Sequence, residues 1–224
     1  MNIKYNKKKQ ELKSDPVITA LVKAKEFVLK NNTAVIGGLV VILFVLVGVL
    51  LFNRAKESSI RQAQEMFGLA VLEYNQNNLD EAISYFGDAA NSFSHTPQGK
   101  MSAYMLGGIY YSQDNFDEAI KWFERAVSNK SSSGFIGAQA LVGLGVSHEA
   151  SGNSAKAMEY YRRALRDDRI AFQHPSVRWK MALLSRSENS ELATELCKEL
   201  ISDTTATYYH QEAKNLLASM EAGS

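Results

Sequence analysis

The segment DNFDEAIKWFERAV, residues 114–127, has relatives elsewhere in the same chain. Two further segments align with it without gaps, NNLDEAISYFGDAA at 77–90 and GNSAKAMEYYRRAL at 152–165. The alignment brings Ala82, Ala119 and Ala157 into register at intervals of 37 and 38 residues. In each copy an aromatic residue follows four positions later, and an alanine follows three positions after that. Since a fixed period of roughly 20–50 residues is the signature of stacked repeats, the chain is predicted to fold as a repeat protein.

The pattern resembles the tetratricopeptide repeat, a helix–turn–helix unit of about 34 residues with a small, an aromatic and a small residue on its second helix. The middle copy also has Leu106, Gly107 and Tyr110 at the family's Leu-Gly-x-x-Tyr positions of the first helix, and the next copy keeps Leu144 and Gly145. The resemblance implies an all-α solenoid of about three to four helix pairs. Its repeats are expected at about 63–96, 100–133 and 138–171, with a degenerate unit at 174–202.

The degenerate fourth unit has Pro175 at the start of its first helix and Ala193, Cys197 and Leu200 at the three marker positions. Cys197, the single cysteine, is therefore predicted to be a core residue. Residues 204–220 read as an amphipathic helix that caps the open end of the solenoid, as such an end requires. The residues expected to face inward in this cap are Tyr208, Ala213, Leu216 and Leu217.

An uncharged apolar run, AVIGGLVVILFVLVGVLLF, occupies residues 34–52. Its 19 residues, at about 1.5 Å rise each, nearly span a hydrocarbon core of roughly 30 Å. A transmembrane anchor at 33–52, ahead of a repeat domain at 57–224, is predicted in preference to a buried core helix. A cleaved signal peptide is disfavoured, because FNRAKESS follows the run without a small-residue cleavage site.

Charge predicts the orientation of this anchor. Residues 1–30 contain eight lysines, whereas residues 53–72 contain three basic residues, so the N-terminus is predicted to be cytoplasmic. Residues 1–32 are expected to form a cytoplasmic lysine-rich tail with a juxtamembrane amphipathic helix that begins near Pro16 and lies on the membrane surface. Beside a membrane, anionic lipid is a better match for KYNKKKQELK than nucleic acid, so no nucleic-acid partner is predicted.

The acidic residues of the repeats are explained without a metal or a catalytic site. Asp117 and Glu118 open a second helix, where carboxylates stabilise the positive end of the helix dipole and cap free amides, and the same pair recurs at 80–81. Ser147 and His148 are adjacent on a helix and point about 100° apart, which prevents them from acting as nucleophile and base. No enzyme activity, cofactor or metal is predicted.

In tetratricopeptide domains the first helices line a concave groove, which the second, fifth, ninth and twelfth positions of each repeat face. The resemblance places twelve residues there: Gln64, Phe67, Val71 and Tyr74, then Met101, Tyr104, Gly108 and Tyr111, then Gln139, Val142, Val146 and Glu149. The partner-binding residues predicted among them are Phe67, Val71, Tyr74, Met101, Tyr104, Tyr111, Val142 and Val146. Such side chains suit extended or helical apolar segments of proteins. They do not match the lysines and asparagines with which some co-chaperones of the family grip acidic C-termini. In the alternative interpretation, neighbouring helices or the C-terminal cap fill the groove.

The combination of a lysine-rich tail, one N-terminal span and a C-terminal repeat domain resembles the bacterial ancillary subunit family of the SecYEG translocon. This resemblance implies a single-pass protein of the bacterial inner membrane, with its repeat domain in the periplasm. It also implies a scaffold that works with the Sec translocon and a membrane-bound chaperone. One alternative is a structural assembly factor of an envelope or cell-division complex. Another is a mitochondrial presequence receptor, which would need its repeat domain in the cytosol.

Overall fold

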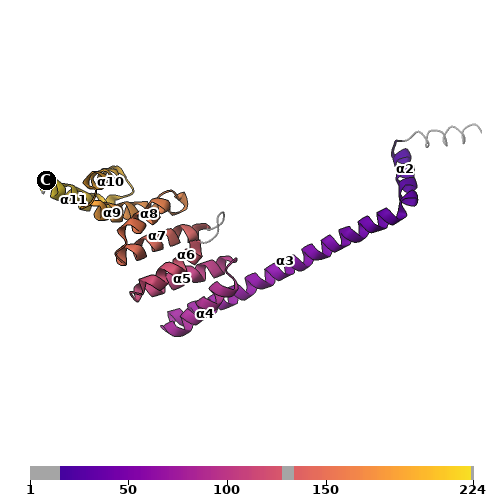
Figure 1. Cartoon of the computed structure of the whole chain (residues 1–224), viewed down its shortest axis with the longest axis horizontal. Helices are drawn as coiled ribbons and strands as arrows, with labels where there is room; N and C mark the ends of the chain where they lie inside the picture. Colours follow the sequence, from indigo (N-terminus) through magenta and orange to yellow (C-terminus); the bar gives the residue numbers. More distant parts are fainter. Residues whose placement is uncertain (1–15, 128–133, 223–224) are drawn as a thin grey trace, which may run out of the picture. The chain divides into compact units, whose positions relative to one another are not determined.

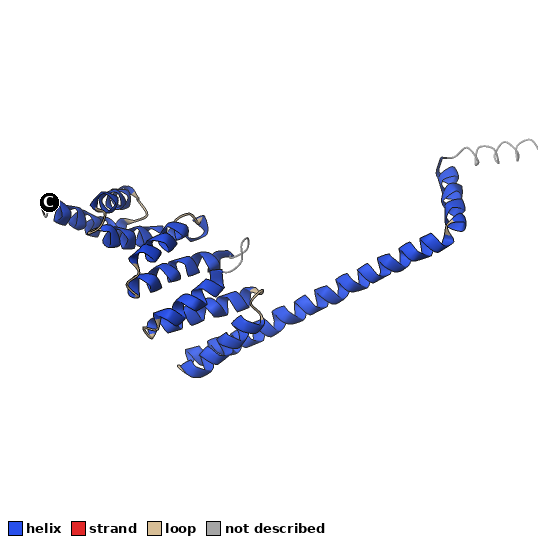
Figure 2. Ribbon diagram, in the orientation of Figure 1, coloured by secondary structure: helices blue, strands red, loops and turns tan. Residues whose placement is uncertain are grey.

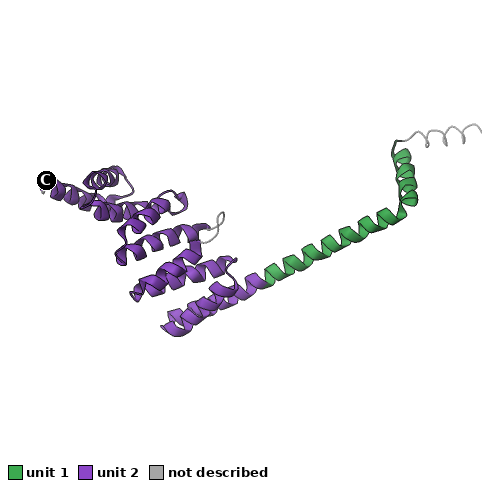
Figure 3. Cartoon of the chain, viewed as in Figure 1, with its two compact units in different colours: residues 1–58 green, residues 59–224 purple. Residues whose placement is uncertain are grey.

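The computed structural model describes residues 16–127 and 134–222, which form helices and turns with no strand among them (Figures 1 and 2). The all-α fold predicted from the sequence is therefore confirmed. The lysine-rich segment KYNKKKQELK, for which contact with anionic lipid is predicted, lies outside the described residues. The chain divides into two units, residues 1–58 and 59–224 (Figure 3).

The helices follow one another with short connections. In chain order the α-helices are α2 (Pro16–Lys30), α3 (Asn32–Asn75), α4 (Leu79–Ser92), α5 (Pro97–Ser112), α6 (Phe116–Val127), α7 (Gly134–Ala150), α8 (Ser154–Ala164), α9 (His174–Ser185), α10 (Ser190–Ser202) and α11 (His210–Glu221). Two 3₁₀ helices, η1 (Asp168–Gln173) and η2 (Thr207–Tyr209), precede α9 and α11. Helices α5 to α8 each pack against the next one along the chain (Figure 1).

Helix α3 contains the apolar run. Among the described residues it is the helix that is long and apolar enough to cross a membrane, and its most apolar window has no buried residue. The same helix continues without a break to Asn75, so the connection between the apolar run and the first repeat is helical rather than a loop.

The marker positions of the second helices are all buried. They comprise Ala82, Phe86 and Ala89 of α4, Ala119, Phe123 and Ala126 of α6, Ala157, Tyr161 and Ala164 of α8, and Ala193, Cys197 and Leu200 of α10. This confirms the repeat register and the core position of Cys197. The small residues let two helices approach closely, and the larger residue between them fills the space that remains.

Glycines on the first helices make room for these aromatic rings. A Cβ atom added to Gly107 of α5 or to Gly143 of α7 would lie 2.6 Å from the ring of Phe123. A Cβ atom at Gly145 would lie 2.3 Å from the ring of Tyr161. Both rings therefore pack directly on helix backbone, which requires glycine at these positions.

The turn inside each repeat explains the polar residues that open the aligned segments. Asn77, Asp114 and Gly152 hold equivalent positions, and each has a positive φ, at 64°, 57° and 80°. Asparagine, aspartate and glycine are the residues that tolerate this left-handed conformation best. The next residue is an asparagine that directly precedes the second helix; the side chain of Asn153, for example, caps α8 by accepting a hydrogen bond from the amide of Lys156 at 3.2 Å. Asp114 is thus a turn residue.

Two histidines that look scattered in the sequence occupy equivalent places in the structure. Nε2 of His174 lies 3.2 Å from the carbonyl oxygen of Asp167, and Nε2 of His210 lies 3.0 Å from that of Asp203. Because a carbonyl oxygen can only accept, each Nε2 donates the proton. Each bond connects the start of a helix, α9 or α11, to the end of the repeat that precedes it.

The C-terminal helix α11 packs against α10 and η2. Ala213 and Leu216 are buried, as predicted for a cap, but Tyr208 is 77% exposed and the prediction for it is wrong. The reason is that residues 207–209 form a 3₁₀ turn before α11 begins at His210. This turn directs Tyr208 outward, with its ring edge-on to Tyr209 at 5.0 Å.

Candidate protein-binding surface

We use the term groove face for the twelve first-helix positions that the repeat register predicts to line a groove on α3, α5 and α7. Of the eight partner-binding residues predicted there, none is fully buried. Tyr74 and Tyr111 are exposed, and the other six are half-buried. Helices α5 and α7 lie side by side, which brings the residues of two repeats onto one surface.

The rings of the two tyrosines of α5 pack against α6, the second helix of the same repeat. The ring of Tyr104 lies 5.7 Å from that of Phe123, and the ring of Tyr111 lies 5.7 Å from that of Phe116. Both pairs are tilted, the arrangement that aromatic quadrupoles favour. Burial raises the pKa of the Tyr104 hydroxyl, so this side chain is neutral at physiological pH. The rings are thus held in place before any partner arrives.

The flanking repeats contribute apolar side chains that also cover the core. Phe67 of α3 packs against Phe86 at 5.7 Å, and Val71 contacts the same buried cluster. Val142 and Val146 of α7 pack against the next cluster along the chain. The alternative interpretation was that neighbouring helices fill the groove. It holds in part, because Phe67, Val71, Val142 and Val146 already pack against the core of the domain. Tyr74 and Tyr111 offer the largest free surfaces.

Glu149, at the twelfth position of α7, joins three helices. Its carboxylate accepts a hydrogen bond from the hydroxyl of Tyr161 on α8 and lies 3.7 Å from Nζ of Lys180 on α9. Burial, followed by this hydrogen bond, raises the pKa of Tyr161, which keeps the phenol protonated. The sequence register placed Glu149 on the groove face, but no local signal identified partners that come from two other helices.

Ser147 and His148 do not form a reactive pair. The Ser147 hydroxyl donates to the carbonyl oxygen of Gly143 at 2.8 Å, one turn earlier in its own helix. The His148 ring is 5% exposed and stacks on Tyr160, with ring centroids 5.3 Å apart. Within the part of the chain that the structure describes, Nε2 of His148 has no hydrogen-bond partner. The histidine is therefore a packing residue at the position that Tyr110 holds in the preceding repeat.

The burial of His148 predicts a dependence of stability on pH. Burial lowers the pKa of the ring below its ordinary value, and Lys156 lowers it further, while Glu124 and Glu159 oppose this. The unfolded chain then binds more protons than the folded chain at pH values between the lowered pKa and about 6.5. The free energy of unfolding should fall as pH decreases through this window. Urea titrations of wild type and His148→Phe should show a weaker decrease in the variant; equal pH profiles would contradict the prediction.

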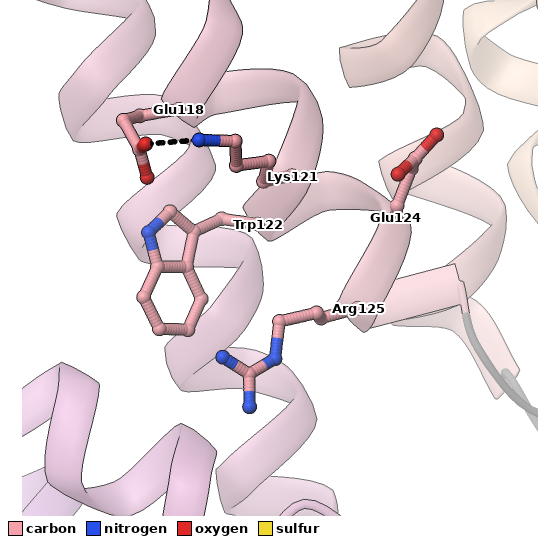
Figure 4. Close-up of a pocket in the computed structure, with 5 residues that line it drawn as sticks. All are labelled: Glu118, Lys121, Trp122, Glu124 and Arg125. Carbon is pink, nitrogen blue, oxygen red and sulfur yellow. Dashed lines mark hydrogen bonds and ion pairs between the residues drawn. The ribbon is translucent and has the colours of Figure 1, made fainter.

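The outer surface of α6 carries a shallow depression of about 400 Å³. Figure 4 shows the five residues that line it: Glu118, Lys121, Trp122, Glu124 and Arg125. Lys121 pairs with Glu118, and the Arg125 guanidinium lies 4.6 Å from the centre of the Trp122 ring. All five belong to α6, so no side chain from a second helix lines the depression. Within residues 16–127 and 134–222, no three or more His, Cys, Asp or Glu side chains are arranged to hold a metal ion.

The comparison with protein families agrees with the geometry of the repeats. Residues 99–169, from α5 into η1, match the tetratricopeptide repeat model. A similar solved structure is the N-terminal domain of stress-induced protein-1 (STI-1) from C. elegans, with a TM-score of 0.49 and 18% sequence identity, over 57% of this chain and 97% of that one. No curated protein matches the chain. The match over 99–169, together with the buried register of the second helices, shows that the repeats have a tetratricopeptide-like helical fold.

Proposed function

We propose that this protein is a membrane-anchored scaffold, without catalytic activity, whose groove face binds apolar segments of partner polypeptides. The observation that carries the proposal is the pair of tyrosines on α5, Tyr104 and Tyr111, which are held by α6 and flanked by uncharged side chains. Aromatic rings that remain partly open to solvent provide a large contact area at a small loss of conformational entropy. Apolar helices or extended segments are the partners that such a surface fits.

We further propose that α3 anchors the protein in the bacterial inner membrane, with the repeat domain in the periplasm. The exposed apolar window of α3 and the excess of lysines before it support this topology. In the periplasm the scaffold works with the Sec translocon and a membrane-bound chaperone. The order of lysine-rich tail, single span and repeat domain in the chain supports this part of the proposal. A structural assembly factor of an envelope or cell-division complex remains the alternative. Crosslinking of the membrane-embedded protein followed by mass spectrometry separates the two by the partners recovered.

The topology can be tested with protease. In spheroplasts of a Gram-negative host that expresses the chain, external protease should digest residues 57–224 and spare an epitope placed at the N-terminus. The reason is that positively charged flanks stay on the cytoplasmic side of a single span. Immunoblots with antibodies against each end measure both fragments. A repeat domain that resists protease until the membrane is lysed would contradict the proposed location.

The binding surface can be tested with the double variant Tyr104→Ala, Tyr111→Ala. Truncation of aromatic anchors at the centre of an interface often costs 2 kcal/mol or more, so affinity should fall at least about tenfold. The probe is a labelled synthetic peptide with leucines at three- and four-residue spacing, and the protein is the full chain in nanodiscs. Fluorescence anisotropy measures binding, and empty nanodiscs correct for peptide that enters the lipid.

The matched control is the double variant Lys121→Ala, Lys156→Ala, which removes two exposed side chains from second helices. This variant should bind the peptide as wild type does, because second helices lie away from the groove face. Circular dichroism should remain helical for both double variants. If the folded tyrosine variant binds as tightly as wild type, partners dock on another surface.

A further inference from the structure

A cavity of about 330 Å³ lies between the third and fourth repeats. Its walls come from α8, from the end of α9, and from the turn and first residues of α10 that follow. Among the described residues that line it, none belongs to the groove face. Ligand pockets in proteins have volumes of roughly 300–1,000 Å³, and this cavity is at the lower end of that range. It therefore fits a molecule about the size of one or two amino acids.

The cavity has apolar side chains and a buried hydroxyl in its walls. Met158, Leu184 and Leu192 line it, and all three are half-buried against a buried apolar cluster of the domain. An apolar group in the cavity would therefore contact side chains that the fold already holds in place. Ser185 also lines the cavity and is 5% exposed, and no group of residues 16–127 or 134–222 hydrogen-bonds with its hydroxyl. A polar ligand atom would give this hydroxyl a partner.

Two opposite charges line the same cavity. Arg162 comes from α8, and Glu188 comes from the turn between α9 and α10. Within the part of the chain that the structure describes, neither side chain forms an ion pair, so the two do not reach each other across the cavity. Charge-assisted hydrogen bonds are the strong ones, and a molecule with both a carboxylate and an ammonium group can form one with each residue.

The repeats provide an internal comparison for this pair of charges. Positions are counted from the first marker alanine of each second helix. At the preceding junction, between the second and third repeats, the equivalent of Arg162 is Glu124 and the equivalent of Glu188 is Gly152. The helices of that junction stack without an arginine and a glutamate at these places. The charge pair is therefore a property of one junction, and stacking of the repeats does not require it.

We infer that the cavity between α8 and the α9–α10 turn binds a small zwitterion with an apolar side chain, of the class of an amino acid or a dipeptide. The carboxylate of the ligand contacts Arg162, and its ammonium group contacts Glu188. Its apolar side chain lies against the methionine and the two leucines of the walls. Because these groups come from two repeats, the bound ligand joins them and stabilises the folded chain. The site is separate from the groove face and goes beyond the proposed function.

The test is isothermal titration calorimetry of the full chain in nanodiscs with L-leucine and with L-leucyl-L-leucine. At least one of them should bind and raise the melting temperature, and the tighter one identifies the length of the ligand. Glycine or glycylglycine should bind at least about tenfold more weakly, because it lacks the apolar side chain that the cavity buries. Absence of binding by both leucine compounds would overturn the inference.

The roles of the two charges are tested with Arg162→Gln and Glu188→Gln. Each variant should bind the zwitterion about tenfold more weakly, because it loses one charge-assisted hydrogen bond. The amide of the ligand, which lacks the carboxylate, should bind wild type and Arg162→Gln equally. The N-acetylated ligand, which lacks the ammonium group, should bind wild type and Glu188→Gln equally. Unchanged affinity for the zwitterion in both variants would overturn the inference.

The matched controls are Arg166→Gln and Glu195→Gln, which make the same substitutions at exposed residues outside the cavity. Both should bind the zwitterion as wild type does, and circular dichroism should show all four variants equally helical. Equal losses in the controls and in the cavity variants would mean that net charge alone governs binding, which contradicts the site. The leucine-spaced peptide reports on the groove face separately, so failure of the cavity to bind a zwitterion leaves the proposed function intact.

Discussion

Replacement of Phe123 by alanine is expected to lower the free energy of unfolding by about 3–5 kcal/mol. Phe123 is 4% exposed, and its ring lies against Gly107 on α5 and Gly143 on α7. Because neither glycine has a side chain that can move into the vacated space, the cavity should remain largely open, which places the loss at the upper end for such substitutions. Urea or thermal unfolding of the full chain in detergent, followed by circular dichroism, measures the loss.

Phe172→Ala is the matched control for this prediction. It removes the same atoms from a ring that is 67% exposed and stacks on Phe135 at 6.1 Å. Its loss should stay within about 0.5–1.5 kcal/mol, the range of a single aromatic pair. Equal losses for the two variants would mean that the ring of Phe123 does not join the second and third repeats as described.

The second large effect is expected at Gly99, in the first turn of α5. A Cβ atom there would lie 2.0 Å from the carbonyl oxygen of Phe93. Gly99→Ala must therefore displace backbone, and it should also disturb the cap, in which Thr96 Oγ1 accepts from the Gly99 amide at 3.0 Å and donates to Phe93 O at 2.7 Å. Gly99→Ala is therefore expected to lower the free energy of unfolding by about 1–3 kcal/mol through overpacking, and by about 1 kcal/mol more through loss of the cap.

Gly87→Ala is a control that is expected to change stability in the opposite direction. It makes the same substitution in the middle of α4, where, apart from the adjacent residues and the backbone of the helix itself, no described atom lies within 4 Å of the new methyl group. Since alanine favours helix over glycine by about 0.5–1 kcal/mol, this variant should melt at a higher temperature than wild type. A Gly99→Ala protein as stable as Gly87→Ala would contradict the structure of the connection between α4 and α5.

Much of the fold follows from periodicity in the sequence. The recurrence of Ala82, Ala119 and Ala157 at nearly constant spacing predicted a repeat protein, and the resemblance to the tetratricopeptide repeat implied all-α helix pairs with buried marker residues. The reason is that the period of a helix determines which residues share a face, and residues that share the inner face of every repeat are buried together. The same register predicted the groove face, in which Phe67 and Val142 are half-buried. Composition alone identified residues 34–52 as a candidate span.

Contacts between different helices depended on the tertiary structure. Gly107 and Gly108 are adjacent and identical in the sequence, yet one underlies the ring of Phe123 and the other borders open space. The partners of Glu149 on α8 and α9 were not predictable for the same reason, and Tyr208 was predicted on the wrong side. Sequence patterns specify the face of a helix on which a residue lies. The atoms that meet that face depend on how neighbouring helices pack, which involves residues far apart in the chain.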